Sequence, residues 1–212
     1  DFRTNAAKAA RDAAIAAGLI PILQHKLDAL LAKAERIKTN IAGKYPDIMR
    51  AIQDPRSLKE VTIIALVNGV LCRSRYDLLP PKEYGFTLDL KFTGLSAEPG
   101  EWARKMQRDY LFQGDLYPRL LAATRGDRAE FRFLAIETDD LAASSLHAMA
   151  PSLAEVAETR VNHALAKWRD CLATGYWPEY PSAICYAEAP AWMITQDDER
   201  AYREQYLQEH AA

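Results

Sequence analysis

The stretch that decides the fold is Glu60-Val-Thr-Ile-Ile-Ala-Leu-Val-Asn-Gly-Val-Leu-Cys-Arg-Ser-Arg-Tyr-Asp77. Its first part, Glu60 to Val67, is apolar and rich in β-branched residues, which favour strands. Asn68-Gly69 is the strongest short signal for a hairpin turn, and Val70 to Asp77 continues as an alternation of residue types. The stretch therefore predicts two antiparallel strands.

The rest of the chain supplies further strands and several helices. Strands are predicted at Tyr84 to Thr93 after the Pro80-Pro81 break, at Phe131 to Glu137 and near Leu146. Apolar periodicity predicts helices over 5–17, 21–41, 45–53, 101–123, 152–173 and 197–209. Gly43 is expected to stop the second helix, and Gly114 and Pro118 are expected to bend the fourth. The order predicts an α/β (α+β) domain, with a mixed central sheet flanked by helices and an irregular tail over 177–191.

Length and composition fit one globular domain covering residues 1–212. The net charge of -2 lacks the basic signature of many nucleic-acid binders, but an enzyme that grips DNA locally needs only a few arginines. Cys72, Cys171 and Cys185 are scattered, which excludes a four-cysteine iron–sulfur site and favours a reducing cytoplasm. No apolar stretch is long enough to span a membrane. Since the chain does not begin with Met, we expect a native N-terminal segment to be missing.

Candidate chemistry lies on the second and third predicted strands. Because alternate residues of a strand share a face, Arg73, Arg75 and Asp77 are expected to point the same way. Asp89 and Lys91 share a face on the next strand for the same reason. Two carboxylates and a lysine can therefore meet. Flanking Asp77, the two arginines are candidate phosphate contacts or plain outer-strand charges.

An Asp-x-Lys sequence on a strand is more often a solvated face than an active site. Here the other face is apolar, formed by Phe86, Leu88, Leu90 and Phe92. Covering Asp89 and Lys91 without partners would be costly. Mg²⁺ prefers oxygen ligands and keeps several waters, so Asp77, Asp89 and the Leu90 carbonyl could hold it. Lys91 could then serve the attacking water and balance charge in the transition state.

These residues carry a family resemblance. Cys72-Arg-Ser-Arg-Tyr-Asp77 followed by Leu88-Asp-Leu-Lys-Phe-Thr93 resembles the core of PD-(D/E)XK nucleases. Gln113-Gly-Asp-Leu-Tyr117 resembles the Gln-x-x-x-Tyr motif of the exonuclease VIII, lambda exonuclease and RecB-like branch, and Glu60 is similar to the acidic residue preceding its core. The segments 166–178 and 189–192 resemble the C-terminal part of exonuclease VIII and its prophage relatives. Together the resemblance covers about 19–192.

The resemblance implies a restriction-endonuclease-like core and a DNA exonuclease that degrades linear duplex 5′→3′, leaving single strands for phage-type recombination. It implies a site for Mg²⁺, with Mn²⁺ as a substitute, formed by Asp77, Asp89, the Leu90 carbonyl and Glu60. The implied catalytic residues are Asp77, Asp89, Lys91, Glu60 and Gln113. The expected DNA contacts are Arg73, Arg75, Gln113 and Tyr117. It also implies double-stranded DNA ends as substrate, a single-strand annealing recombinase as partner and a ring-shaped homo-oligomer.

Two departures and two alternatives accompany the resemblance. Tyr76 stands where the motif has Pro, and the family's upstream His motif is not evident, so we expect weaker end binding than in a longer chain. The alternatives are a structure-specific endonuclease of the same fold and a catalytically silent DNA-end-binding module. The complete Glu, Asp, Asp, Lys set argues against silence. The tryptophans are interpreted as core residues rather than base-stacking ones: Trp102, Trp168, Trp177 and Trp192.

Overall fold

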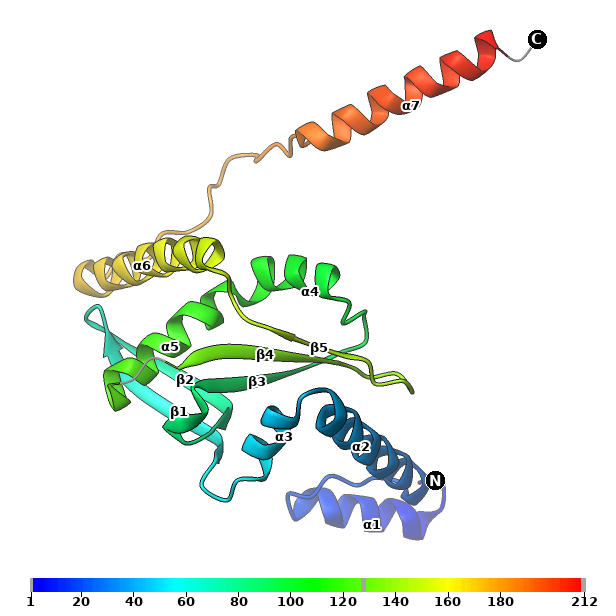
Figure 1. Cartoon of the computed structure of the whole chain (residues 1–212), viewed down its shortest axis with the longest axis vertical. Helices are drawn as coiled ribbons and strands as arrows, with labels where there is room; N and C mark the ends of the chain where they lie inside the picture. Colours follow the sequence, from blue (N-terminus) through cyan, green and yellow to red (C-terminus); the bar gives the residue numbers. More distant parts are fainter. Residues whose placement is uncertain (1, 127–128, 211–212) are drawn as a thin grey trace. The chain divides into compact units, whose positions relative to one another are not determined.

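The computed structural model describes residues 2–126 and 129–210. Its contacts divide the chain into two compact units, Asp1–Thr174 and Gly175–Ala212. The first unit carries a five-stranded sheet (Figure 1). The second unit is an extended tail followed by helix α7 (Ala191–Glu209). The prediction of one nuclease domain over the whole length is not tested by this division and stays a prediction.

The sheet is mixed, and its spatial order follows the chain as β1-β2-β3-β4-β5. The β3 and β4 strands pair in parallel, and the other neighbours are antiparallel. The strands are β1 (Leu58–Val67), β2 (Val70–Leu79), β3 (Phe86–Thr93), β4 (Glu130–Glu137) and β5 (Ser144–His147). Asn68 and Gly69 both adopt positive φ, 49° and 79°, which matches the right-handed twist of the β1–β2 hairpin. The predicted fold class is confirmed.

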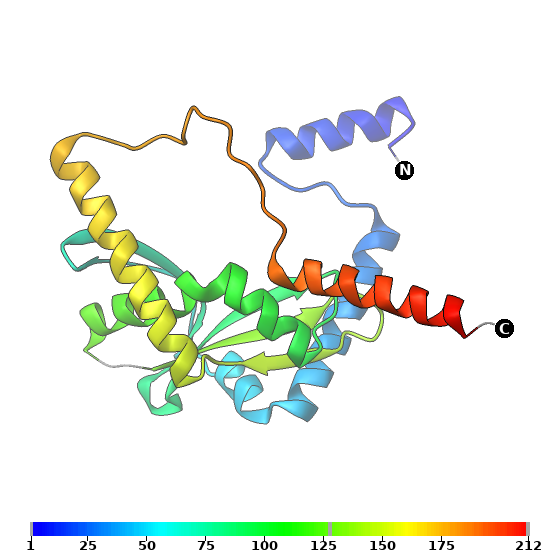
Figure 2. The same cartoon turned by 90° about the horizontal axis from the view of Figure 1, so that it is seen from above.

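Helices cover both faces of the sheet (Figures 1 and 2). One face packs against α2 (Gln24–Lys44) and α3 (Pro46–Gln53), and α1 (Asn5–Ala16) precedes them. On the other face lie α4 (Pro99–Lys105), the π-turn η2 (Met106–Tyr110), α5 (Leu111–Arg125) and α6 (Pro151–Thr174). None of the described helices is long and apolar enough to cross a membrane.

Two large apolar clusters form most of the core, one on each side of the sheet, and a third small cluster contains Ala97, Trp102 and Ala135. The α5/α6 side includes Tyr76, Leu120, Leu121, Phe131, Phe133 and Val161. The α2/α3 side includes Ile48, Leu78, Phe86, Leu88, Leu134 and Ile136. Because Phe86 and Leu88 face α2/α3, the alternation of a strand turns Asp89 toward the α5 side. The apolar face predicted for β3 is thereby confirmed at its first two positions.

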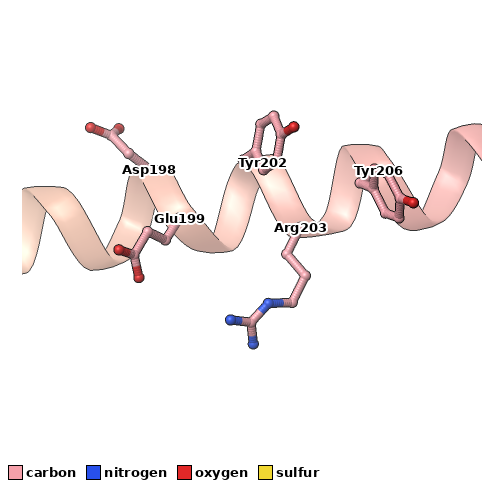
Figure 3. Close-up of a pocket in the computed structure, with 5 residues that line it drawn as sticks. All are labelled: Asp198, Glu199, Tyr202, Arg203 and Tyr206. Atoms are coloured by element: carbon pink, nitrogen blue, oxygen red, sulfur yellow. The ribbon is translucent and has the colours of Figure 1, made fainter.

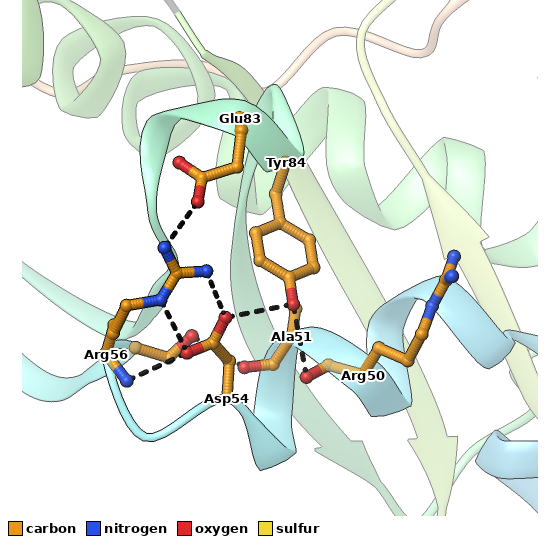
Figure 4. A network of polar contacts seen from close by, with 7 residues as sticks. Arg50, Ala51, Asp54, Arg56, Glu83 and Tyr84 are labelled. Carbon is orange, nitrogen blue, oxygen red and sulfur yellow. Dashed lines mark hydrogen bonds and ion pairs between the residues drawn. The ribbon is translucent and has the colours of Figure 1, made fainter.

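A polar network connects the start of β1 to the turn before β3 (Figure 4). Asp54 accepts hydrogen bonds from the Arg56 backbone at 2.9 Å and guanidinium at 2.7 Å, and from the Tyr84 hydroxyl at 3.2 Å. Arg56 also pairs with Glu83 at 2.7 Å. These hydrogen bonds lower the pKa of Asp54 to about 2, the side-chain bond from Arg56 contributing most. The network fixes the 3₁₀ turn η1 (Lys82–Tyr84), from which β3 begins.

Several sequence predictions are corrected by the structure. Helix α2 continues through Gly43 to Lys44, because Tyr45 and Pro46 follow at once and begin the next helix. Tyr84 belongs to the turn η1 rather than to β3. The irregular stretch in the long helix is the π-turn at Met106–Tyr110, and α5 runs unbroken past Gly114 and Pro118. Only one tryptophan, Trp102, lies in the core, whereas the other three are exposed: Trp168, Trp177 and Trp192.

Helix α7 carries exposed aromatic side chains. Figure 3 shows Asp198, Glu199, Tyr202, Arg203 and Tyr206 projecting from this helix. These five residues line a surface pocket, and among the described residues only this helix contributes to it. A shallow surface of this kind lacks the convergent polar groups of a small-molecule site.

Candidate active site

The candidate site lies where β2 and β3 separate. These two strands are paired only at Leu78 and Leu88. The carbonyls of Gly85 and Thr93 point to the other edge of β3, the one that faces β4. They accept hydrogen bonds from the backbone amides of Glu130 and Thr138, each at 2.9 Å. Successive residues of a strand direct their backbone groups to opposite edges, so Leu90 faces β2. Its carbonyl therefore points into the gap between the strands.

The carboxylate of Asp77 fills part of this gap. Its Oδ2 accepts a hydrogen bond from the Leu90 amide at 2.6 Å, in place of a strand-to-strand bond. Residues directly opposite each other in an antiparallel pair share a face. Since Leu78 lies opposite Leu88 on the α2/α3 side, the adjacent pair Asp77 and Asp89 lies on the α5 side. The convergence predicted for the two strands is present.

Asp89 is the buried centre of the site, only 3% exposed. Its Oδ2 lies 2.6 Å from the ammonium of Lys91, and its Oδ1 accepts a hydrogen bond from the amide of Gln113. Burial raises the pKa of Asp89, and the negative charge of Asp77 adds to the increase, while Lys91 and Gln113 oppose it. A buried carboxylate that must stay ionised needs cationic partners.

Lys91 approaches Asp89 from beside two aromatic rings. Its Nζ lies 4.7 Å from the ring centroid of Tyr110 and 6.0 Å from that of Phe133. The Lys91 side chain is 20% exposed, so it is mostly covered but still reached by solvent. A cation in this setting can reach a phosphate or water that enters the site.

The residues present fit a hard divalent cation. Two carboxylates, Asp77 and Asp89, and the Leu90 carbonyl converge at one edge of β3. Mg²⁺ is commonly held by one or two carboxylates and keeps several waters. Among the described residues, no group of three His, Cys, Asp or Glu side chains could hold a metal. The donor set therefore suits Mg²⁺ rather than a four-ligand zinc site.

Comparison with known proteins agrees with this geometry. Residues 23–190 match the model of the family described as PDDEXK-like domain of unknown function (DUF3799). The chain belongs to this family. A crystal structure of a candidate exonuclease from Eubacterium rectale is similar in fold, with a TM-score of 0.52 at 15% identity over 79% of this chain. The chain spans 65% of the length of that protein.

The match to the crystal structure of SSO0001 includes 69% of this chain and 82% of that one, at 14% identity and a TM-score of 0.27. Similarity at that level carries no weight for the fold. No curated protein matches the sequence.

Glu60 is not brought to the carboxylate pair of this PDDEXK-like domain. Its backbone has φ of 54°, and the ladder between β1 and β2 is interrupted where Glu60 lies opposite Asp77. Its carboxylate instead pairs with Arg75 at 2.8 Å, with both side chains more than half exposed. The structure therefore gives Glu60 an ion pair on the hairpin, and its role at the metal stays a prediction.

The prediction that Arg73, Arg75 and Asp77 share a face is wrong. Along β2, burial alternates regularly as far as Tyr76, which leaves both arginines exposed on the outer face. The interrupted ladder at Glu60 breaks the alternation, so Asp77 turns toward α5. DNA contacts by the two arginines stay predictions.

The Gln-x-x-x-Tyr residues of the PDDEXK-like domain have separate environments. Gln113 lies in the site, where its side-chain amide donates a hydrogen bond to Asp89. Tyr117 packs its half-buried ring against Tyr76 and Phe131, with centroids 5.3 and 5.4 Å away. The backbone carbonyl of Tyr117 also accepts from the Tyr76 hydroxyl at 2.6 Å. Packing is thus the observed role of Tyr117, and a DNA contact stays a prediction.

Sequence reasoning missed the role of Tyr110. The ring covers Lys91 and stacks on Trp102 at 5.6 Å with an interplanar angle of 21°. Tyr110 precedes Gln113 by three residues, a spacing that places both side chains on one face of a helix. This spacing was the sequence signal that could have placed Tyr110 beside the site.

Proposed function

We propose that the chain is a Mg²⁺-dependent deoxyribonuclease that degrades linear double-stranded DNA from its ends. The observation that carries the proposal is the convergence of Asp77, Asp89 and Lys91 at the opening between β2 and β3. Membership of the PDDEXK-like family supports it. A charge-paired, buried carboxylate such as Asp89 is costly for stability, and such arrangements concentrate at functional sites.

Each residue has a distinct part in the proposed reaction. Asp77, Asp89 and the Leu90 carbonyl would hold Mg²⁺ or Mn²⁺, and Gln113 orients Asp89 through its hydrogen bond. The bound ion would supply Lewis acidity toward a phosphate oxygen and a water made easier to deprotonate. Lys91, as an ammonium, would orient the attacking water by a hydrogen bond and stabilise negative charge on the phosphate.

The finer assignment is also a proposal. Resemblance to exonuclease VIII, lambda exonuclease and the RecB-like branch supports 5′→3′ resection that leaves single-stranded DNA for phage-type recombination. It also supports a ring-shaped homo-oligomer and a single-strand annealing recombinase as partner. The scattered free cysteines support a cytoplasmic location.

End-labelled substrates test this function. The protein would be incubated with Mg²⁺, Mn²⁺ or EDTA and with linear duplex labelled at the 5′ or the 3′ end, beside a closed circular duplex. We expect metal-dependent loss of linear DNA only, with early release of the 5′ label. Cutting of the circle would instead establish an endonuclease. Binding of ends without any loss of DNA would establish a silent end-binding module.

A further inference from the structure

Three cations lie close together in the sequence at the end of α4 and in η2. Arg104 forms an ion pair with Glu101, and Arg108 forms one with Asp109 at 2.7 Å. Among the residues that the structure describes, Lys105 has no carboxylate within ion-pair distance. Arg104 and Arg108 are thus paired directly with acids, whereas Lys105 forms no direct pair and acts on Asp109 through its charge, which helps the Arg108 hydrogen bond to lower the pKa of Asp109.

Lys105 contacts aromatic rings, where an ion pair with an acidic residue would be the usual arrangement. Its Nζ lies 5.0 Å from the ring centroid of Trp102 and 6.0 Å from that of Tyr110. Trp102 is buried and stacks on Tyr110, so the two rings form a rigid platform. Cation–π contacts hold an ammonium in place without cancelling its charge, and the lysine stem packs along the rings.

The same platform places Lys105 beside the candidate active site. The Tyr110 ring that lies 6.0 Å from Lys105 also lies 4.7 Å from the Nζ of Lys91. Lys91 forms a direct ion pair with Asp89, whereas the Asp109 carboxylate on which Lys105 acts is paired directly with Arg108. An anion bound at this edge of the site would therefore be attracted by Lys105. The π-turn Met106–Tyr110, which carries the platform into the site, is a feature often found at functional sites.

We propose that Lys105 binds a backbone phosphate of the DNA strand next to the phosphate that is cleaved. This inference rests on the proposed function, because it names a substrate contact of the same site. Arg104 and Arg108, which are paired with acids, would contribute little to it.

The test is the salt dependence of DNA binding in EDTA, where no cleavage occurs. Affinity for a fluorescent linear duplex would be measured by anisotropy over a series of salt concentrations. Lys105→Met keeps an apolar stem on the rings and removes the charge. Arg108→Met is the matched control, since it removes one charge three residues away. Lys105→Arg keeps the charge, and thermal unfolding would confirm that each variant is folded.

We expect Lys105→Met to weaken binding by about tenfold, as expected for losing a charged hydrogen bond. The slope of log affinity against log salt should fall by about 0.7 to 0.9, the contribution of one phosphate contact. Lys105→Arg and Arg108→Met should keep the wild-type slope. Equal slopes for Lys105→Met and wild type would overturn the phosphate contact while leaving the nuclease proposal intact. A wild-type protein that binds no DNA would overturn both.

Discussion

The Asp77 carboxylate accepts a 2.6 Å hydrogen bond from the backbone amide of Leu90, the residue between Asp89 and Lys91. This bond replaces a rung of the sheet where β2 and β3 separate. The bond places Asp77, one candidate metal ligand, against the backbone that carries the other two, Asp89 and the Leu90 carbonyl. The geometry of the site is therefore set by how the sheet opens rather than by a loop, and rigid elements position reactive groups accurately.

Gln113 should support activity through Asp89. Gln113→Leu keeps the approximate volume and removes the donor to Asp89 Oδ1. Residues that orient a metal ligand typically affect affinity or activity by about 10- to 100-fold, so we expect a cleavage rate lower by about tenfold and a higher Mg²⁺ requirement. Single-turnover rates over a Mg²⁺ series measure both. Phe112→Leu, on the exposed neighbour, is the control and should behave as wild type. A Gln113→Leu variant with an unchanged Mg²⁺ series would contradict the assigned role.

The Asp54 network should make stability depend on pH. Hydrogen bonds from Arg56 lower the pKa of Asp54 from 3.8 to about 2 in the folded protein. A carboxylate with a lowered pKa contributes stability above its unfolded-state pKa, and the contribution disappears as pH falls through the folded value. Asp54→Asn should therefore be less stable than wild type at pH near 7. The difference should shrink as pH falls from about 4 toward about 2. Urea unfolding of both proteins across that range measures it, and a difference that does not vary with pH would refute the assignment.

The core beneath the site should be sensitive to truncation. Leu88, next to Asp89, is 0% exposed, whereas Leu71 on the outer face of β2 is 70% exposed. Leu88→Ala removes buried methyl groups and leaves a cavity, which typically costs about 2 to 5 kcal/mol in the free energy of unfolding. Leu71→Ala should change it by less than about 0.5 kcal/mol. Urea unfolding compares the two, and equal costs would show that the described burial of β3 is wrong.

Local sequence signals predicted most of the fold. The hairpin followed from β-branched residues around Asn68-Gly69, and β3 followed from its alternation. The alternation of β3 also placed Asp89 on the face opposite Phe86 and Leu88. These features depend on short-range preferences and on one buried face, both of which are visible in the sequence.

Long-range contacts decided what the sequence could not predict. The positive φ of Glu60 interrupts the ladder and turns Asp77 away from Arg75, although Glu60 is not a residue type that signals such a backbone. The π-turn shifts the helix that carries Tyr110, and nothing in the local periodicity marks a five-residue turn. The platform under Lys91 and Lys105 was therefore invisible until the sheet and helix were seen together.

Lys91→Ala tests the central claim most directly, because it separates catalysis from binding. In the proposed mechanism Lys91 acts on the water and on transition-state charge, while Asp77 and Asp89 hold the metal. DNA-end affinity of Lys91→Ala should be nearly that of wild type, and its single-turnover cleavage rate with Mg²⁺ should be lower by about 10² or more. Asp89→Ala should differ, since raising Mg²⁺ should restore part of its activity but none of that of Lys91→Ala. A Lys91→Ala enzyme that cleaves linear duplex at the wild-type rate would contradict the account.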